Sequence, residues 1–140
     1  MLGPDDETII VASEWVNKAE KDFDAATILM RARTSRPLEP ICFHVQQCVE
    51  KYLKTLLIIN DIEVPRTHNL DLVYALIPNA IRPLLAKTEL DRLTEYAVIP
   101  RYPGDYDPIT LDEARSAVRV MRRVRKDIRR RLPDRVTGCE

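Results

Sequence analysis

The first apolar pattern along the chain has the period of a helix. Between residues 8 and 33, apolar side chains recur at spacings of three and four residues, at Ala12, Val16, Ala19, Phe23, Ala26 and Met30. Residues at these spacings lie on one face of an α-helix. The pattern predicts a long first helix with one face turned to a core, and a flexible N-terminus over residues 1–8.

A second long helix is predicted from residue 40 to residue 59. Pro40 follows a proline-containing break and suits a first helical turn, where its missing amide hydrogen is not needed. One side of this helix is apolar, with Ile41, Cys42, Val45, Cys48, Val49, Tyr52, Leu53, Leu56 and Ile59. The opposite side mixes apolar and polar residues: Phe43, Gln47, Glu50, Lys51, Lys54 and Ile58. That mixture indicates that something covers part of the second side as well.

Shorter helical pieces follow before a last long helix. Residues 70–77 predict a short helix closed by Pro78, and residues 88–96 predict another. Thr110 and Glu113 form the Thr-x-x-Glu pattern, in which the two side chains satisfy free amides at a helix start. The last helix is therefore expected from residue 111 to residue 132, where Pro133 stops it.

Together these patterns predict a single all-α domain over residues 9–132, followed by a polar tail over residues 133–140. A chain of 140 residues can bury one substantial core. The simplest assembly is an up-and-down antiparallel bundle of four main helices plus short helical pieces. No apolar run is long enough for a membrane span, and the acidic start does not resemble a secretion signal, so a cytoplasmic protein is expected.

Charge is distributed very unevenly along the chain. Lys and Arg number 22 and so do Asp and Glu, yet residues 115–135 hold ten basic side chains against two acidic ones, a balance of +8. Such a helix could bind nucleic-acid phosphates. Arginine is also a good helix former, and positive charge suits a helix C-terminus, pairs with acids elsewhere in the chain or pairs with an acidic partner. The structural explanations are favoured, and nucleic-acid binding stays open.

The segment "IPRYPGDYDP" at residues 99–108 is a candidate recognition element. Arg101 offers a planar fork to phosphate oxygens, and Tyr102 and Tyr106 offer ring faces for stacking. The alternative is that the prolines only stiffen a crossing and the tyrosines pack on the end of the bundle.

The polar side of the second helix is a second candidate. Gln47, Glu50, Lys51 and Lys54 project within about 100° of arc, which could form a cleft for a nucleotide phosphate. The alternative is a solvated face that carries a Glu50–Lys54 ion pair at i, i+4 spacing.

No metal site or cofactor is predicted. His44 and Cys48 lie four residues apart, but two ligands do not make a site. His68 is expected to cap or stabilise the third helix, and Asp22 and Asp24 are expected to be exposed.

Several blocks of sequence resemble the HEPN domain, whose name stands for higher eukaryotes and prokaryotes nucleotide-binding. They are "KAEKDFDAA" (18–26), "FHVQQCVEKYLKTLL" (43–57), "THNLDLVYAL" (67–76), "RYPGDY" (101–106) and "EARSAV" (113–118). The resemblance covers roughly residues 10–132. It implies an all-helical homodimer, often paired with a small nucleotidyltransferase as a two-component system. Some members are toxin ribonucleases, and others are non-catalytic modules that bind a nucleotide or a partner.

The ribonuclease members carry an arginine and, after four to six residues, a histidine. Here Arg101 is followed after four residues by Tyr106, and neither histidine has the required spacing. Phenol titrates near 10 and imidazole near 6.5, so tyrosine is a poor general base at neutral pH. The resemblance therefore implies a binding module in which Gln47, Glu50, Lys51 and Lys54 converge with Arg101, Tyr102 and Tyr106 on one cleft near the dimer seam.

Two alternatives stay open. One is a metal-independent, toxin-like endoribonuclease in which Arg101 stabilises the phosphorane and Tyr106 or His44 handles the proton. The other is a structural homodimer without a ligand. RNA is a possible ligand of the endoribonuclease. The sequence does not identify which nucleotide or RNA would bind.

Overall fold

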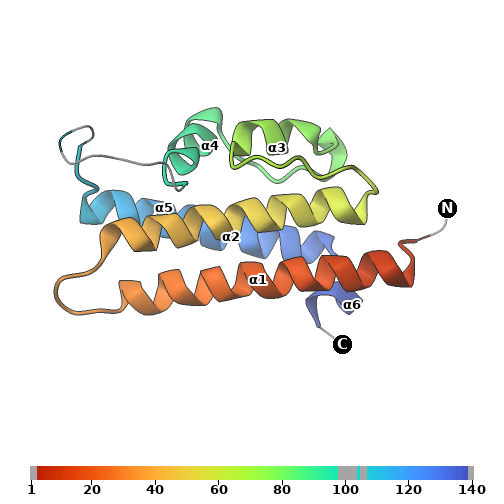
Figure 1. The fold of residues 1–140 in the computed structure, drawn as a ribbon, viewed down its shortest axis with the longest axis horizontal. Coiled ribbons are helices and arrows are strands. Elements are labelled where there is room, and N and C mark those ends of the chain that lie inside the picture. The colour runs from red at the N-terminus through yellow and green to blue at the C-terminus, as the bar shows by residue number, and fades with distance from the viewer. Residues whose placement is uncertain (1–2, 98–103, 105–106, 139–140) are drawn as a thin grey trace.

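The computed structural model is a helical bundle built on three long helices (Figure 1). It describes residues 3–97, 104 and 107–138. The long helices are α1 (Asp6–Met30), α2 (Leu38–Ile59) and α5 (Leu111–Arg131), and the short ones are α3 (Leu70–Leu76), the 3-10 turn η1 (Asn79–Ile81), α4 (Lys87–Thr94) and α6 (Asp134–Thr137). The described residues contain no strand, which confirms the predicted all-α class.

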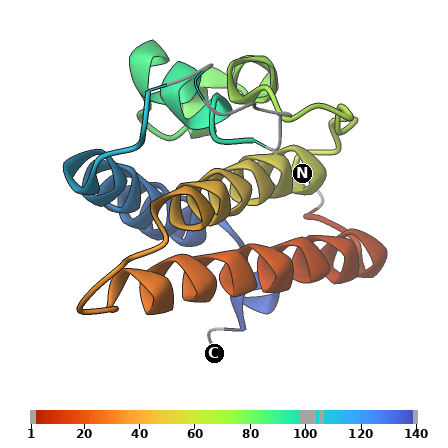
Figure 2. The ribbon, with the colours of Figure 1, turned by 60° about the vertical axis from the view of Figure 1, so that its left-hand side comes forward.

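Helix α2 occupies the middle of the bundle. It runs antiparallel to α1 along most of its length and also packs against α5, α3 and α4 (Figures 1 and 2). Helices α3 and α4 pack on each other and form a second layer over α2. The connection before α3 and this layer cover part of the second side of α2, where Glu50 and Lys54 are buried, as its mixed composition predicted.

The chain crosses the bundle between α2 and α5 through short helices instead of a fourth long one. Pro78 and Pro83 interrupt this region, and each removes an amide hydrogen that a continuous helix would need. Helices α2 and α5 begin at the same end of the bundle and run in the same direction (Figure 1).

Helix boundaries follow local capping. The Asp5 carboxylate accepts a hydrogen bond from the Thr8 amide at 2.8 Å, so α1 begins at Asp6, two residues earlier than the apolar pattern predicted. The Thr110 hydroxyl accepts from the Glu113 amide at 3.1 Å and opens α5 at the predicted residue.

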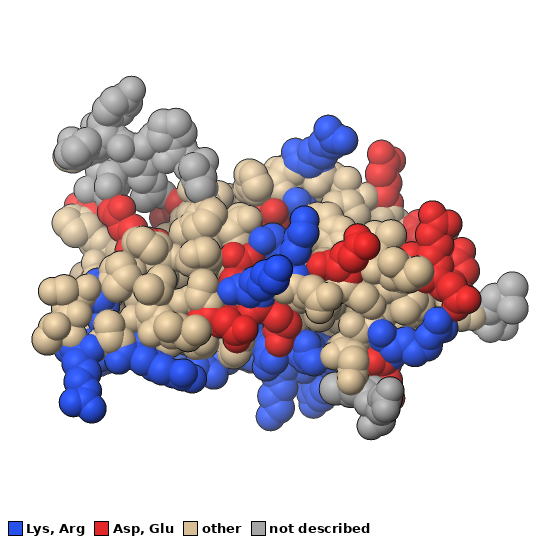
Figure 3. Space-filling view, turned by 60° about the horizontal axis from the view of Figure 1, so that its bottom comes forward, with Lys and Arg blue, Asp and Glu red and all other residues tan. Residues whose placement is uncertain are grey.

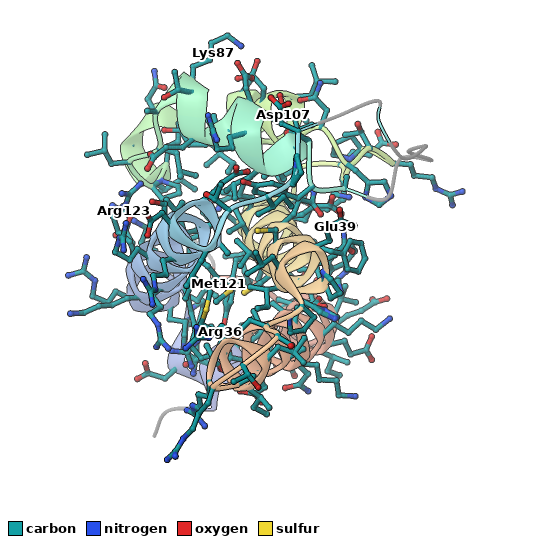
Figure 4. The ribbon with its side chains drawn as sticks, turned by 90° about the vertical axis from the view of Figure 1, so that its left-hand side faces the viewer. Arg36, Glu39, Lys87, Asp107, Met121 and Arg123 are labelled. Atoms are coloured by element: carbon teal, nitrogen blue, oxygen red, sulfur yellow. The ribbon has the colours of Figure 1, made fainter. Side chains whose placement is uncertain are left out.

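The core is formed by the faces that the helical periodicity predicted. Eight of the nine predicted core positions of α2 are buried, and Ile59 is half-buried near the end of the helix. Met121 of α5 lies fully buried between the long helices, whereas Arg123 points outward (Figure 4). None of the described helices combines the length and apolar character that a bilayer crossing requires.

Helix α6 lies in the segment where a polar tail was expected. Its Val136 is buried, and Arg135 pairs with Asp6 of α1 at 2.7 Å. Gly138 ends this helix with a positive φ of 76°, a conformation that glycine adopts without strain.

Replacing Met121 by alanine should lower the free energy of unfolding by about 2–5 kcal/mol, because it leaves a cavity between the long helices. Chemical denaturation measures the change. The control is Arg119→Ala on the exposed side of α5, which should change it by no more than about 0.5 kcal/mol. Equal effects of the two substitutions would contradict the burial of Met121 between the long helices.

Candidate functional site

The polar side of α2 contains a buried network around Glu50. Its side chain is only 4% exposed and accepts hydrogen bonds from Gln46 at 2.9 Å, from His68 Nδ1 at 2.8 Å and from Lys54 at 3.1 Å. Lys54 also donates to the carbonyl of Thr67 at 2.9 Å. These contacts fasten the connection before α3 onto α2. The Glu50–Lys54 pair exists, but it lies inside the protein and not on a solvated face.

A second, half-exposed network lies between α2 and α1. The carboxylate of Asp22 in α1 pairs with His44 Nδ1 at 2.9 Å through one oxygen and with the ammonium group of Lys51 through the other. The side chain of Asp22 is 11% exposed, while those of His44 and Lys51 are 30% and 21% exposed. The prediction that Asp22 is exposed was wrong, because it is the partner of two groups on α2, whereas Asp24 is exposed as predicted.

Asp22 fixes what the neighbouring side chains can offer to a ligand. A carboxylate only accepts hydrogen bonds, so Nδ1 of His44 carries the proton in this pair and Nε2 is left as its second nitrogen. Lys51 has three donors and uses one for Asp22. Gln47 donates to Gln46 Oε1 at 2.5 Å and is also half-buried. We call His44, Gln47 and Lys51 the open polar site.

The four predicted polar residues of α2 therefore separate into two pairs. Gln47 and Lys51 belong to the open polar site, whereas Glu50 and Lys54 are covered. Arg101, Tyr102 and Tyr106 lie outside the described residues, so the expected convergence of "RYPGDY" with α2 stays a prediction.

The histidine and cysteine positions have separate surroundings. Cys48 is fully buried in the core, and burial raises the pKa of its thiol far above the usual range. Within the described part of the chain, no three His, Cys, Asp or Glu side chains are grouped to hold a metal ion. His68 bonds to Glu50, while Asn69 caps α3 through its side-chain oxygen, so His68 anchors the loop and does not cap the helix.

A third polar cluster joins all three long helices. Glu20 of α1 accepts hydrogen bonds from Tyr52 of α2 at 2.5 Å and from Arg125 of α5 at 2.7 Å and 2.5 Å. Arg129 donates to the Tyr52 hydroxyl at 3.1 Å. Burial and the Glu20 hydrogen bond raise the pKa of Tyr52. Burial opposes ionisation of Glu20, but its hydrogen bonds with Arg125 and Tyr52 and the nearby arginine charges outweigh it and lower the Glu20 pKa.

Sequence periodicity could not identify the partners of Asp22, Gln46 and Glu20. Their contacts join positions 22 to 105 residues apart, except for the bonds of Gln46 with Glu50 and Gln47 within α2. A polar residue within an otherwise apolar helical face was the available signal for Glu20 and Asp22. That signal does not indicate which residue is the partner.

Comparison with known protein families identifies the family of this chain. The family model of the HEPN domain matches residues 12–131, nearly the whole chain. The chain belongs to the HEPN family. The HEPN blocks at residues 18–26 and 43–57 contain the Asp22, His44 and Lys51 of the open network.

One curated relative of this chain is named "Putative toxin MJ1304", from Methanocaldococcus jannaschii. It is 31% identical over 103 residues, which cover 68% of this chain and 65% of the relative. The chain therefore spans somewhat less than two thirds of that relative's length. No solved structure matches this HEPN chain.

The Glu20 cluster should make the stability of the HEPN bundle depend on pH. The pKa of Glu20 in the folded protein lies below its ordinary value of 4.5. The stabilisation is therefore fully present when the pH is above 4.5, and it is lost as the pH falls through the lower pKa of the folded state. Urea denaturation of the wild type and of Glu20→Gln should show the largest difference above pH 5 and a shrinking difference below about pH 4.5. A difference that stayed constant from pH 7 to pH 3 would contradict this assignment.

Proposed function

We propose that this HEPN chain is a nucleotide- or partner-binding module and the non-catalytic subunit of a two-component system with a small nucleotidyltransferase. One observation carries the proposal: His44, Gln47 and Lys51 lie half-exposed on one side of α2, and buried or half-buried partners hold each of them. Side chains that are held before a ligand arrives lose little freedom when it binds.

The open polar site offers chemistry that suits a nucleotide. The Lys51 ammonium group has donors to spare for phosphate oxygens, and the Gln47 amide and His44 Nε2 can meet polar edges of a base or sugar. Glu50 and Lys54 contribute indirectly, because they hold the loop beside this site. Arg101, Tyr102 and Tyr106 are further candidate contacts on sequence grounds.

The missing ribonuclease signature supports a binding role. Arg101 is followed after four residues by Tyr106 and not by histidine. A tyrosine with an ordinary pKa near 10 exchanges protons poorly at neutral pH. The change removes the general base and leaves the possible phosphate contact of Arg101.

Calorimetry with ATP and GTP tests the binding site. Lys51→Gln should weaken nucleotide binding about tenfold or more, because a hydrogen bond to a charged phosphate is worth about 1.5–3 kcal/mol. Lys18→Gln, which removes an exposed lysine from α1, is the matched control and should leave the affinity unchanged. Circular dichroism verifies that both variants are folded. No heat with either nucleotide, or equal losses in the two variants, would count against this site.

Co-purification tests the proposed partner. We expect the protein to form a homodimer on a sizing column and to co-purify with a small nucleotidyltransferase encoded beside it. If no such neighbour exists, or if the two proteins elute separately when expressed together, the two-component proposal fails. An intact dimer that binds neither nucleotide nor partner would instead favour a structural homodimer without a ligand.

The Asp22–His44 pair favours one further candidate, a metal-independent endoribonuclease related to toxins. A carboxylate that orients an imidazole is a common arrangement for a general base, and the curated relative's name contains the word toxin. In this alternative Arg101 would stabilise the phosphorane charge.

Incubation with RNA in the presence of EDTA separates this candidate from the binding module. The ribonuclease candidate requires cleavage that is lost in both His44→Ala and Arg101→Ala and is reduced at least about tenfold in Asp22→Asn. The binding module requires that no cleavage is detected. Cleavage that survives all three substitutions would indicate a contaminating nuclease.

A further inference from the structure

Helix α5 presents a continuous basic stripe on its outer side. The stripe consists of five exposed side chains, Arg115, Arg119, Arg122, Lys126 and Arg130. Their spacings of four, three, four and four residues keep them within about 100° of arc, over a length of about 22 Å. Figure 3 shows Lys and Arg atoms along the lower edge of the view, on the side of the molecule where α5 lies.

Acidic side chains neutralise little of this stripe. Arg122 and Lys126 form no ion pair with any residue that the structure describes. Arg115 lies 3.7 Å from Asp112, whose side chain is 95% exposed, so this pair is weak. Arg130 contacts Asp127 at 3.2 Å. The centre of the stripe therefore keeps its positive charge for an external anion.

Part of the stripe borders a groove between α5 and α1. The groove has a volume of about 460 Å³ and is lined by Phe23, Arg122, Arg125, Lys126, Arg129 and Arg130. The guanidinium groups of Arg122 and Arg125 lie 5.4 Å and 4.3 Å from the centre of the Phe23 ring. These cation–π contacts orient the guanidinium groups of Arg122 and Arg125 on the Phe23 ring.

We propose that this stripe binds the phosphate backbone of a nucleic-acid strand without reading its sequence. A length of about 22 Å exceeds what one nucleotide can span, so the stripe fits a chain of phosphates. Five of the six side chains that line the adjoining groove are basic, and two of them stack on the sixth, Phe23. Protein interfaces have an apolar centre, whereas nucleic-acid interfaces are strongly basic and polar. The proposal concerns a surface separate from the open polar site and does not depend on nucleotide binding there.

Fluorescence anisotropy with labelled twelve-nucleotide RNA and DNA strands tests the stripe in the full-length protein. Five phosphate contacts predict a slope of about −3.5 in log affinity against log salt, which is a loss of about a hundredfold between 50 and 200 mM salt. Replacing Arg122, Lys126 and Arg130 by glutamine should reduce the slope to about −1.4, so that the same change in salt costs only about sevenfold.

A second triple variant controls for net charge. The control replaces three exposed basic residues on or near α1 by glutamine: Lys18, Lys21 and Arg33. It therefore removes the same number of positive charges from another part of the surface. The proposal requires this variant to keep the wild-type slope and affinity. It is overturned if no strand binds, if both triple variants lose affinity equally, or if polyglutamate of similar length competes as well as nucleic acid. Circular dichroism confirms that each variant is folded before its binding is interpreted.

Discussion

The enclosure of α2 is the constraint on which the rest of the structure depends. The polar side chains of α2 that α1, α5 and the α3–α4 layer enclose cannot reach water, so each of them needs a partner within the protein. Among the described residues, no buried side-chain nitrogen or oxygen lacks a hydrogen bond. Glu50 binds the loop before α3, Tyr52 binds Glu20, and Thr55 donates to the Lys51 carbonyl. The same requirement that stabilises the fold thus decides which α2 side chains stay available to a ligand.

This division explains why polar residues of similar type have different roles along one helix. Lys54 is enclosed and serves the loop, whereas Lys51, three residues earlier, is held by Asp22 at the boundary with solvent. In the enclosed network, Lys54 and Glu50 neutralise each other's charge, so removing either side chain would leave a buried charge unpaired. The open polar site therefore rests on an inner layer that cannot vary freely. Residues of both layers lie within residues 12–131, the part of the chain that the HEPN family model matches.

Helices and core faces could be predicted from the sequence because they follow a local period, and the predicted positions of α2 are buried almost without exception. The partners of Asp22 and Glu20 could not, because a contact between Glu20 and Arg125 spans 105 residues and leaves no local pattern. The covering of Glu50 and Lys54 escaped prediction for the same reason, although Phe43 and Ile58 indicated that some cover existed. The short α6 was missed because its four residues carry only one apolar side chain that becomes buried, Val136.

The common direction of α2 and α5 has a consequence for how the chain folds. Helices α1 and α2 are joined by a short connection, whereas α5 reaches α2 only after the intervening segment has crossed the bundle. Closing a long loop costs more chain entropy than closing a short one, and non-local contacts form more slowly. We therefore expect the α1–α2 hairpin to form first and α5 to dock late. Until α5 docks, the carboxylate of Glu20 lacks Arg125 and Arg129. The docking of α5 is therefore the step that supplies the cations that neutralise Glu20.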